Sequence, residues 1–107
     1  MKFLTITTVK DIYYMLPQAE KTKLNAVSVE YLIKQKKKKG DKQRFYSTAG
    51  GTLYSIGEYE SIEEYSESLR QSPRIAAGYM NVECIPVIEM DEKAIIAYEE
   101  RMKAGKK

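Results

Sequence analysis

The pattern of hydrophobic and polar residues predicts four β-strands in this chain. The segments are rich in β-branched and aromatic residues and cover residues 2–9, 43–49, 52–60 and 81–89. In the first strand, Leu4 and Ile6 fall on one face. Phe3, Thr5 and Thr7 fall on the other, because side chains alternate along a strand. Each face of this strand is therefore only partly apolar.

Glycine and proline residues add detail to these strands. Gly50 and Gly51 separate the second strand from the third, and both can adopt positive φ, which predicts a tight hairpin. A phosphate-binding loop is the alternative, but such a loop opens a helix, and here another strand follows. Pro86 lacks an N–H, so we expect this end of the fourth strand to lie at an edge of the sheet or past the paired region.

A long helix is predicted over residues 17–39. Leu24, Val27 and Tyr31 recur there at positions i, i+3 and i+7, the spacing of a face that packs on a core. Apolar residues also alternate from position 27 to position 33, which would suit a strand. The lysine run and the glycine that end this segment favour the helix.

Two further helices are predicted near the C-terminal half of the chain. Ser61 and Glu64 form a capping box for the first of them, and Pro73 ends it before a connection of small residues. Its expected buried stripe is Ile62, Tyr65 and Leu69. The last helix covers residues 91–104 and turns Ile95, Tyr98 and Met102 to one side.

The order of these elements is β-α-β-β-α-β followed by an extra helix, which predicts a ferredoxin-like α+β domain with a four-stranded antiparallel sheet. We expect one domain over residues 1–107, with its core in residues 2–90. Both helices would cover one face of the sheet and leave the other open. Because the strands carry apolar residues on both faces, we expect a homodimer, sheet-to-sheet or edge-to-edge, or a higher assembly through the C-terminal helix.

The amino-acid composition indicates the type of protein and its expected location in the cell. The 107 residues are 43% hydrophobic and 31% charged, as in ordinary globular proteins. No apolar run reaches the ~20 residues that cross a bilayer, and the N-terminus lacks the pattern of a signal peptide. The single cysteine, Cys84, is expected to be a small buried residue. We therefore expect a cytoplasmic protein without a membrane partner.

The chain has no histidine, which excludes several classes of active site. A Ser-His-Asp triad, a Cys-His pair and a Cys/His zinc site all need this residue. Acid–base chemistry must then come from carboxylates, lysine or tyrosine. No acidic residues have the spacing of metal ligands, so we expect neither a metal nor a cofactor.

Positive charge gathers in the first half of the chain. Residues 1–50 hold eleven basic and four acidic side chains, whereas residues 51–107 hold seven and eleven. Much of the excess is the run from Lys34 to Lys39. Lysines complement the C-terminal end of a helix, and we favour this interpretation. The alternative is weak binding of nucleic acid, but no motif of aromatic residues beside the run supports it.

The middle of the chain carries a family resemblance. Gly40 ends a long helix, and the strands RFYSTAG and LYSIGEYES and the helix SIEEYSESLRQSP follow in order. In these features the chain resembles the muconolactone isomerase-like group of dimeric α+β barrel proteins, over about residues 2–90. The resemblance implies an isomerase-like enzyme that moves a proton on a small lactone or carboxylated substrate without metal. The same superfamily includes other enzymes and members of unknown activity, so fold alone does not give function.

Six residues are candidates for such a site. Glu58 and Glu83 could act as the catalytic base if burial raises the pKa of the carboxyl. Substrate could be held by Arg44, Tyr46, Tyr54 and Arg74. The alternatives are structural: Glu58 would point outward, Arg44 would pair with an acidic residue of the next strand, and the tyrosines would be ordinary strand residues.

Three hypotheses about function remain open. The first is a small-molecule site between the sheet and the helices. The second is a non-catalytic homo-oligomer in which the tyrosines form the interface. The third is nucleic-acid binding through Lys34–Lys39, the least favoured of the three.

Overall fold

The protein is described by a computed structural model that covers residues 1–105. The last two residues of the expected domain, 106–107, lie outside the described residues. The elements are β1 (Lys2–Val9), α1 (Asp11–Tyr14), α2 (Gln18–Lys39), a 3-10 turn η1 (Gly40–Lys42), β2 (Gln43–Ser47), β3 (Leu53–Glu58), α3 (Ile62–Arg70), α4 (Pro73–Ala76), β4 (Met80–Val87) and α5 (Glu92–Ala104). The four expected strands and three expected helices are confirmed, with shorter bounds in most cases.

The strands form one sheet in the order β2-β3-β1-β4, and every neighbouring pair is antiparallel. The expected α+β class with a four-stranded antiparallel sheet is therefore confirmed. β4 is an edge strand, as Pro86 predicted. The arrangement is compatible with a ferredoxin-like fold, but the order of elements does not match it exactly, because α1, α4 and α5 are additional helices.

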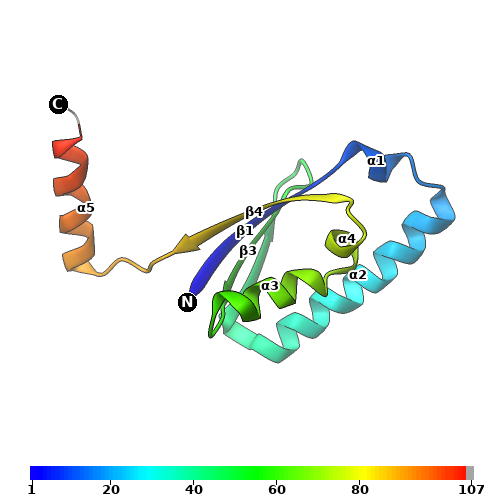
Figure 1. Ribbon diagram of the computed structural model, residues 1–107, viewed down its shortest axis with the longest axis horizontal. Coiled ribbons are helices and arrows are strands. Elements are labelled where there is room, and N and C mark those ends of the chain that lie inside the picture. The colour runs from blue at the N-terminus through cyan, green and yellow to red at the C-terminus, as the bar shows by residue number, and fades with distance from the viewer. Residues whose placement is uncertain (106–107) are drawn as a thin grey trace.

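The two faces of the sheet differ in what covers them. Helices α2, α3 and α4 lie on one side, which we call the covered face (Figure 1). The register places Phe3, Thr5 and Thr7 there, all buried. The opposite side, the open face, carries Leu4, Ile6, Arg44, Tyr46, Tyr54, Ile56, Glu58, Glu83 and Ile85. Figure 1 shows α5 standing apart from both the sheet and the other helices.

A small aromatic core sits on the covered face. The rings of Phe3 and Tyr65 stack with centroids 4.2 Å apart, and Tyr59 lies 5.0 Å from Tyr65. Leu69 packs against this cluster. The core joins β1 to α3 and to the end of β3, since these three elements supply its residues.

The hairpin turn and the cap of α3 form where the sequence predicts them. Gly51 has φ 87° in the hairpin between β2 and β3, so the hairpin interpretation of the two glycines is confirmed. Ser61 caps α3 by accepting a hydrogen bond from the Glu64 N–H. The Glu64 carboxylate accepts one from the Glu60 N–H at 2.6 Å, which lowers the pKa of that carboxyl.

The lysine run ends α2, as expected. Gly40 terminates the helix with φ 57°, and Lys36 donates hydrogen bonds to the carbonyls of Gly40 and Gln43 at 3.0 and 2.6 Å. Lys39 donates to the Glu58 carbonyl at 2.7 Å and lies 3.6 Å above the Tyr59 ring. These two lysines tie the helix end to the sheet.

Some details of the predicted packing are wrong. Val27 is exposed, because α2 turns the neighbouring face with Ser28 toward the sheet. Ile62 is exposed because it is the first residue of α3, ahead of the turn that carries buried Tyr65. Pro73 ends α3 and also begins α4, where a plain connection was expected. Cys84 is exposed rather than buried, because it lies on the edge strand.

Candidate functional site

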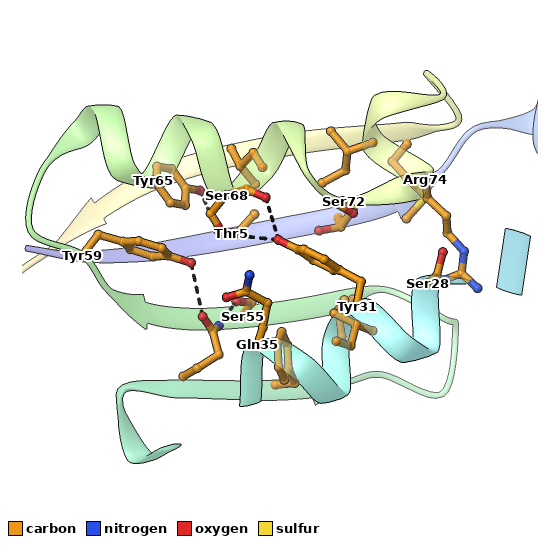
Figure 2. A pocket seen from close by; sticks show the side chains of 18 residues that line it. Thr5, Ser28, Tyr31, Gln35, Ser55, Tyr59, Tyr65, Ser68, Ser72 and Arg74 are labelled. Carbon is orange, nitrogen blue, oxygen red and sulfur yellow. Dashed lines mark hydrogen bonds between the residues drawn. The ribbon is translucent and has the colours of Figure 1, made fainter. Parts of the chain in front are cut away.

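A cavity lies between the covered face and helices α2, α3 and α4 (Figure 2). About 70 Å³ of it is open to the centres of water-sized molecules, where a single water needs roughly 10–15 Å³. The polar part of its lining is Thr5, Thr7, Ser28, Tyr31, Gln35, Gln43, Ser55, Tyr59, Tyr65, Ser68, Ser72 and Arg74. Within residues 1–105, no carboxylate side chain lines it. The cavity is therefore rich in hydroxyls and amides and has one cationic residue.

Gln43 organises one end of the cavity. Its side chain is 2% exposed; it donates to the Ser55 hydroxyl at 2.6 Å and accepts from the Tyr59 hydroxyl at 3.2 Å. Gly57 makes room for this arrangement, because a Cβ there would lie 2.8 Å from Gln43 Oε1 and 2.9 Å from the Tyr59 ring. The amide is thus fixed in one orientation.

Two tyrosines of the aromatic core present hydroxyls to the same space. The Tyr65 hydroxyl lies 2.5 Å from Thr5 Oγ1. Burial raises the pKa of Tyr65, and burial also raises the pKa of Tyr59. Both phenols therefore stay protonated at neutral pH, when they can donate hydrogen bonds but cannot act as bases.

Tyr31 links the helices across the cavity. Its hydroxyl donates to the Ser68 carbonyl at 2.6 Å and lies 3.2 Å from the Ser68 hydroxyl. Figure 2 shows the Tyr31 ring between the Gln35 and Ser28 side chains of the same helix. This bond holds α2 and α3 at a fixed separation, which keeps the space between them open.

Three buried polar atoms in residues 1–105 have no hydrogen-bond partner: Ser28 Oγ, Gln35 Oε1 and Arg74 Nε. All three residues line this one cavity. A buried polar group without a partner costs about 1–3 kcal/mol, and native proteins contain few of them. The three atoms therefore mark a space that a polar occupant would complete.

Arg74 stands at the end of the cavity occupied by Ser28 (Figure 2). Its terminal NH₂ group donates to Asn25 Oδ1, which also accepts from the Tyr13 hydroxyl at 2.7 Å. The guanidinium lies 5.9 Å from the centre of the Tyr13 ring. These contacts orient the arginine while its Nε–H remains free to donate.

The structure separates the residues proposed from sequence. Arg74 lines the cavity, whereas the register places Arg44, Tyr46, Tyr54, Glu58 and Glu83 on the open face. Glu58 lies 3.6 Å from the Lys2 ammonium there. The cavity and these five residues are on opposite sides of the sheet, so they do not form one site between sheet and helices.

Sequence analysis missed the amides and serines of the cavity. Ser28 and Gln35 are seven residues apart and fall on the helix face of Leu24, Tyr31 and Leu32, where polar residues interrupt an apolar stripe. That interruption was the available signal. Gln43 gave no comparable signal, because a polar residue at the start of a strand is ordinary.

Comparison with known proteins adds no assignment. No family model matches the chain, and no curated protein matches it in sequence.

Within residues 1–105, no helix has both the length and the apolar character that a bilayer crossing requires. The same residues contain no cluster of three acidic or cysteine side chains that could hold a metal ion.

Proposed function

We propose that the protein binds a small polar molecule that carries a carboxylate, in the cavity between the covered face and the helices. The observation that supports this most directly is the set of three unpartnered atoms, Ser28 Oγ, Gln35 Oε1 and Arg74 Nε. Each belongs to a residue of the cavity wall. A bound ligand would complete their hydrogen bonding.

The chemistry of these atoms indicates the ligand. The Arg74 Nε–H is a charged donor and pairs best with a carboxylate oxygen. Gln35 Oε1 is an acceptor and needs a donor, such as a hydroxyl or an amide N–H. The Ser28 hydroxyl can serve either way. A short hydroxy acid has both kinds of group, whereas a lactone with a carboxylate has both only if it also carries a hydroxyl.

A thermal-shift screen of small hydroxy acids and carboxylated lactones tests this proposal. Ligands that bind only the folded protein raise its melting temperature with concentration. We expect at least one such acid to do so, and the Arg74→Ala variant to lose the shift. A panel without any shift on the unmodified protein would contradict the proposal.

Arg44→Ala is the matched control, because it removes an arginine from the open face. It should leave the ligand-induced shift unchanged if the cavity is the site. Loss of the shift in Arg44→Ala but not in Arg74→Ala would move the site to the open face, to the group of Arg44, Glu58 and Glu83. The pair of variants thus decides between the two locations.

An isomerase-like reaction is the narrower form of the proposal and rests on the family resemblance. It needs a group that accepts a proton, and the two tyrosines with raised pKa do not supply one. Incubation of a bound acid with the protein in D₂O tests it. Deuterium entering a carbon position, followed by proton NMR, would support turnover; an unlabelled ligand would limit the protein to binding.

We also propose that the domain forms a homodimer of the ferredoxin-like, dimeric α+β barrel class. The support is the antiparallel sheet with helices on one side and apolar residues on the other. Light scattering on the purified chain tests it, and a monomer at all accessible concentrations would contradict it.

A further inference from the structure

Helix α5 does not pack against the sheet or the other helices within residues 1–105. It stands apart from the rest of the molecule, beyond the end of β4 (Figure 1). The radius of gyration is 17.0 Å, whereas a compact domain of this length has about 13 Å. Along α5, Ile95, Tyr98 and Met102 share one side and are 49%, 43% and 49% exposed. This side is an apolar stripe that the described part of the chain leaves exposed.

The open face of the sheet is the second uncovered apolar surface. Its two central rows of paired residues run across all four strands. One row is Arg44, Ile56, Leu4 and Ile85, and the next is Tyr46, Tyr54, Ile6 and Glu83. Six apolar side chains thus lie between Arg44 at the β2 edge and Glu83 at the β4 edge.

The charges beside the two surfaces are complementary. At 100° per residue, Glu99 lies on one flank of the α5 stripe and Arg101 on the other. When α5 lies along the strands with Glu99 toward Arg44, Arg101 comes to the side of Glu83. Opposite charges therefore face each other when α5 runs in this direction along the strands, and like charges face each other when it runs in the reverse direction.

The connection to α5 leads away from the sheet of its own chain. Lys2 donates to Glu89 at 3.2 Å and lies 3.6 Å from Glu58. The contact with Glu89 places the segment after β4 beside the start of β1, and α5 continues outward from there (Figure 1). The helix is therefore displayed to a second molecule, and the open face remains free to receive one.

We propose that two copies of this chain exchange their α5 helices, each laid on the open face of the other copy's sheet. Ile95, Tyr98 and Met102 of one copy would then cover Leu4, Ile6, Ile56 and the residues beside them on the other. A two-fold arrangement buries both apolar surfaces of both copies. This inference rests on the homodimer proposed above, but it places α5 on each open face, where a dimeric α+β barrel has direct contact between the two sheets. It is independent of the ligand cavity.

Light scattering on three forms of the full chain tests the exchange. The unmodified chain should have twice the mass of one copy. Ile95→Lys places a charge in the stripe and should halve that mass, whereas Ile96→Lys, on the other side of α5, should not change it. Circular dichroism confirms that both variants are folded. A monomeric unmodified chain would overturn the homodimer and the exchange together.

The remaining outcome separates the two proposals. A dimer that persists in Ile95→Lys would retain the homodimer and overturn the exchange, because the copies would then meet without α5. Cross-linking distinguishes the exchange of α5 between two copies from an α5 helix that folds back onto the sheet of its own chain. In a Cys84→Ser background, chains with Ile56→Cys are mixed with chains with Ile95→Cys and treated with a short bismaleimide. Covalent heterodimers are expected, and their absence would overturn the exchange.

Discussion

The two faces of the sheet differ in the side chains they carry, and each departs from the usual pattern of burial. The covered face carries hydroxyl and amide side chains, among them Thr5, Thr7 and Gln43, around a cavity. The open face carries aliphatic residues such as Leu4, Ile6 and Ile85. Burial usually selects apolar residues and exposure polar ones. Here the covered face has polar side chains beside its aromatic core, and the open face has aliphatic side chains beside Arg44, Glu58 and Glu83.

These departures are what the two proposals, a ligand in the cavity and a second copy on the open face, would explain. Polar atoms without partners in a closed space are satisfied by a polar ligand, and an exposed apolar patch is covered by another protein surface. The sheet would then separate two kinds of recognition, a small molecule on one side and a second copy on the other. Variants on the two faces should accordingly have different consequences.

The largest difference is expected between Phe3→Ala and Ile85→Ala. Phe3 is 4% exposed in the aromatic core, and its truncation should lower the free energy of unfolding by about 3–5 kcal/mol. Ile85 is 40% exposed on the open face. Ile85→Ala should therefore lower the free energy of unfolding mainly when two copies are associated. Urea unfolding at two protein concentrations measures the change in the free energy of unfolding for each variant. Equal effects at both concentrations for Ile85→Ala would contradict its place in an interface.

Gly57→Ala should be the next largest change. The new Cβ would crowd Gln43 Oε1 and the Tyr59 ring, and overpacking of this kind costs about 1–3 kcal/mol. Gly50→Ala is the control, because its Cβ would have one ordinary contact, 3.8 Å from Thr48 Oγ1. Thermal unfolding of the two variants compares them. Similar melting temperatures would show that the Gln43 end of the cavity is not rigid.

Ser28→Ala should have a smaller effect of opposite sign. Removing a buried hydroxyl without a partner should raise the free energy of unfolding of the empty protein by about 1 kcal/mol. Thr5→Val is the contrast, because it removes a hydroxyl that is bonded to Tyr65 and should destabilise. Chemical unfolding without ligand measures both. A destabilised Ser28→Ala would indicate a structural hydroxyl and weaken the ligand proposal.

The last prediction concerns the pH dependence that the buried tyrosines give to stability, which appears only in alkaline solution. Burial raises the pKa of Tyr59 and of Tyr65, so their contribution to stability is fully present below the ordinary tyrosine pKa of about 10. It is lost as pH rises through the raised folded value, because the unfolded chain ionises first. Tyr65→Phe should flatten this alkaline decline, whereas Tyr46→Phe on the open face should not. An unchanged decline in Tyr65→Phe would contradict the assignment.

Much of the fold could be predicted from sequence because its signals are local. The two glycines of the β2–β3 hairpin, the Ser61 cap and Pro86 each act through their own backbone. The additional helix α4 was missed because its four residues are too short for a periodic pattern. Val27 was placed in the core because apolar spacing was weighed above the polar residues beside it.

The candidate site was harder to predict because it depends on which side of the sheet each residue faces. Arg44, Glu58 and Glu83 were grouped by their chemistry, yet the strand register turns them away from the helices. Ser28 and Gln35 lie on α2 and Arg74 lies on α4, much later in the chain, and all three are ordinary in type. Only the packing of α2, α3 and α4 over the sheet brings them to one cavity.

Pro86 has a consequence for the protein in concentrated solution. An edge strand offers unpaired backbone donors to any extended chain it meets, and this is a common route to fibrous aggregation. On β4, Pro86 removes one of these donors close to where the strand ends. A foreign strand would lack a backbone donor at this end of the edge. Pro86 thus disfavours growth of the sheet from this end of β4, whereas the proposed two-copy assembly would use the broad open face instead.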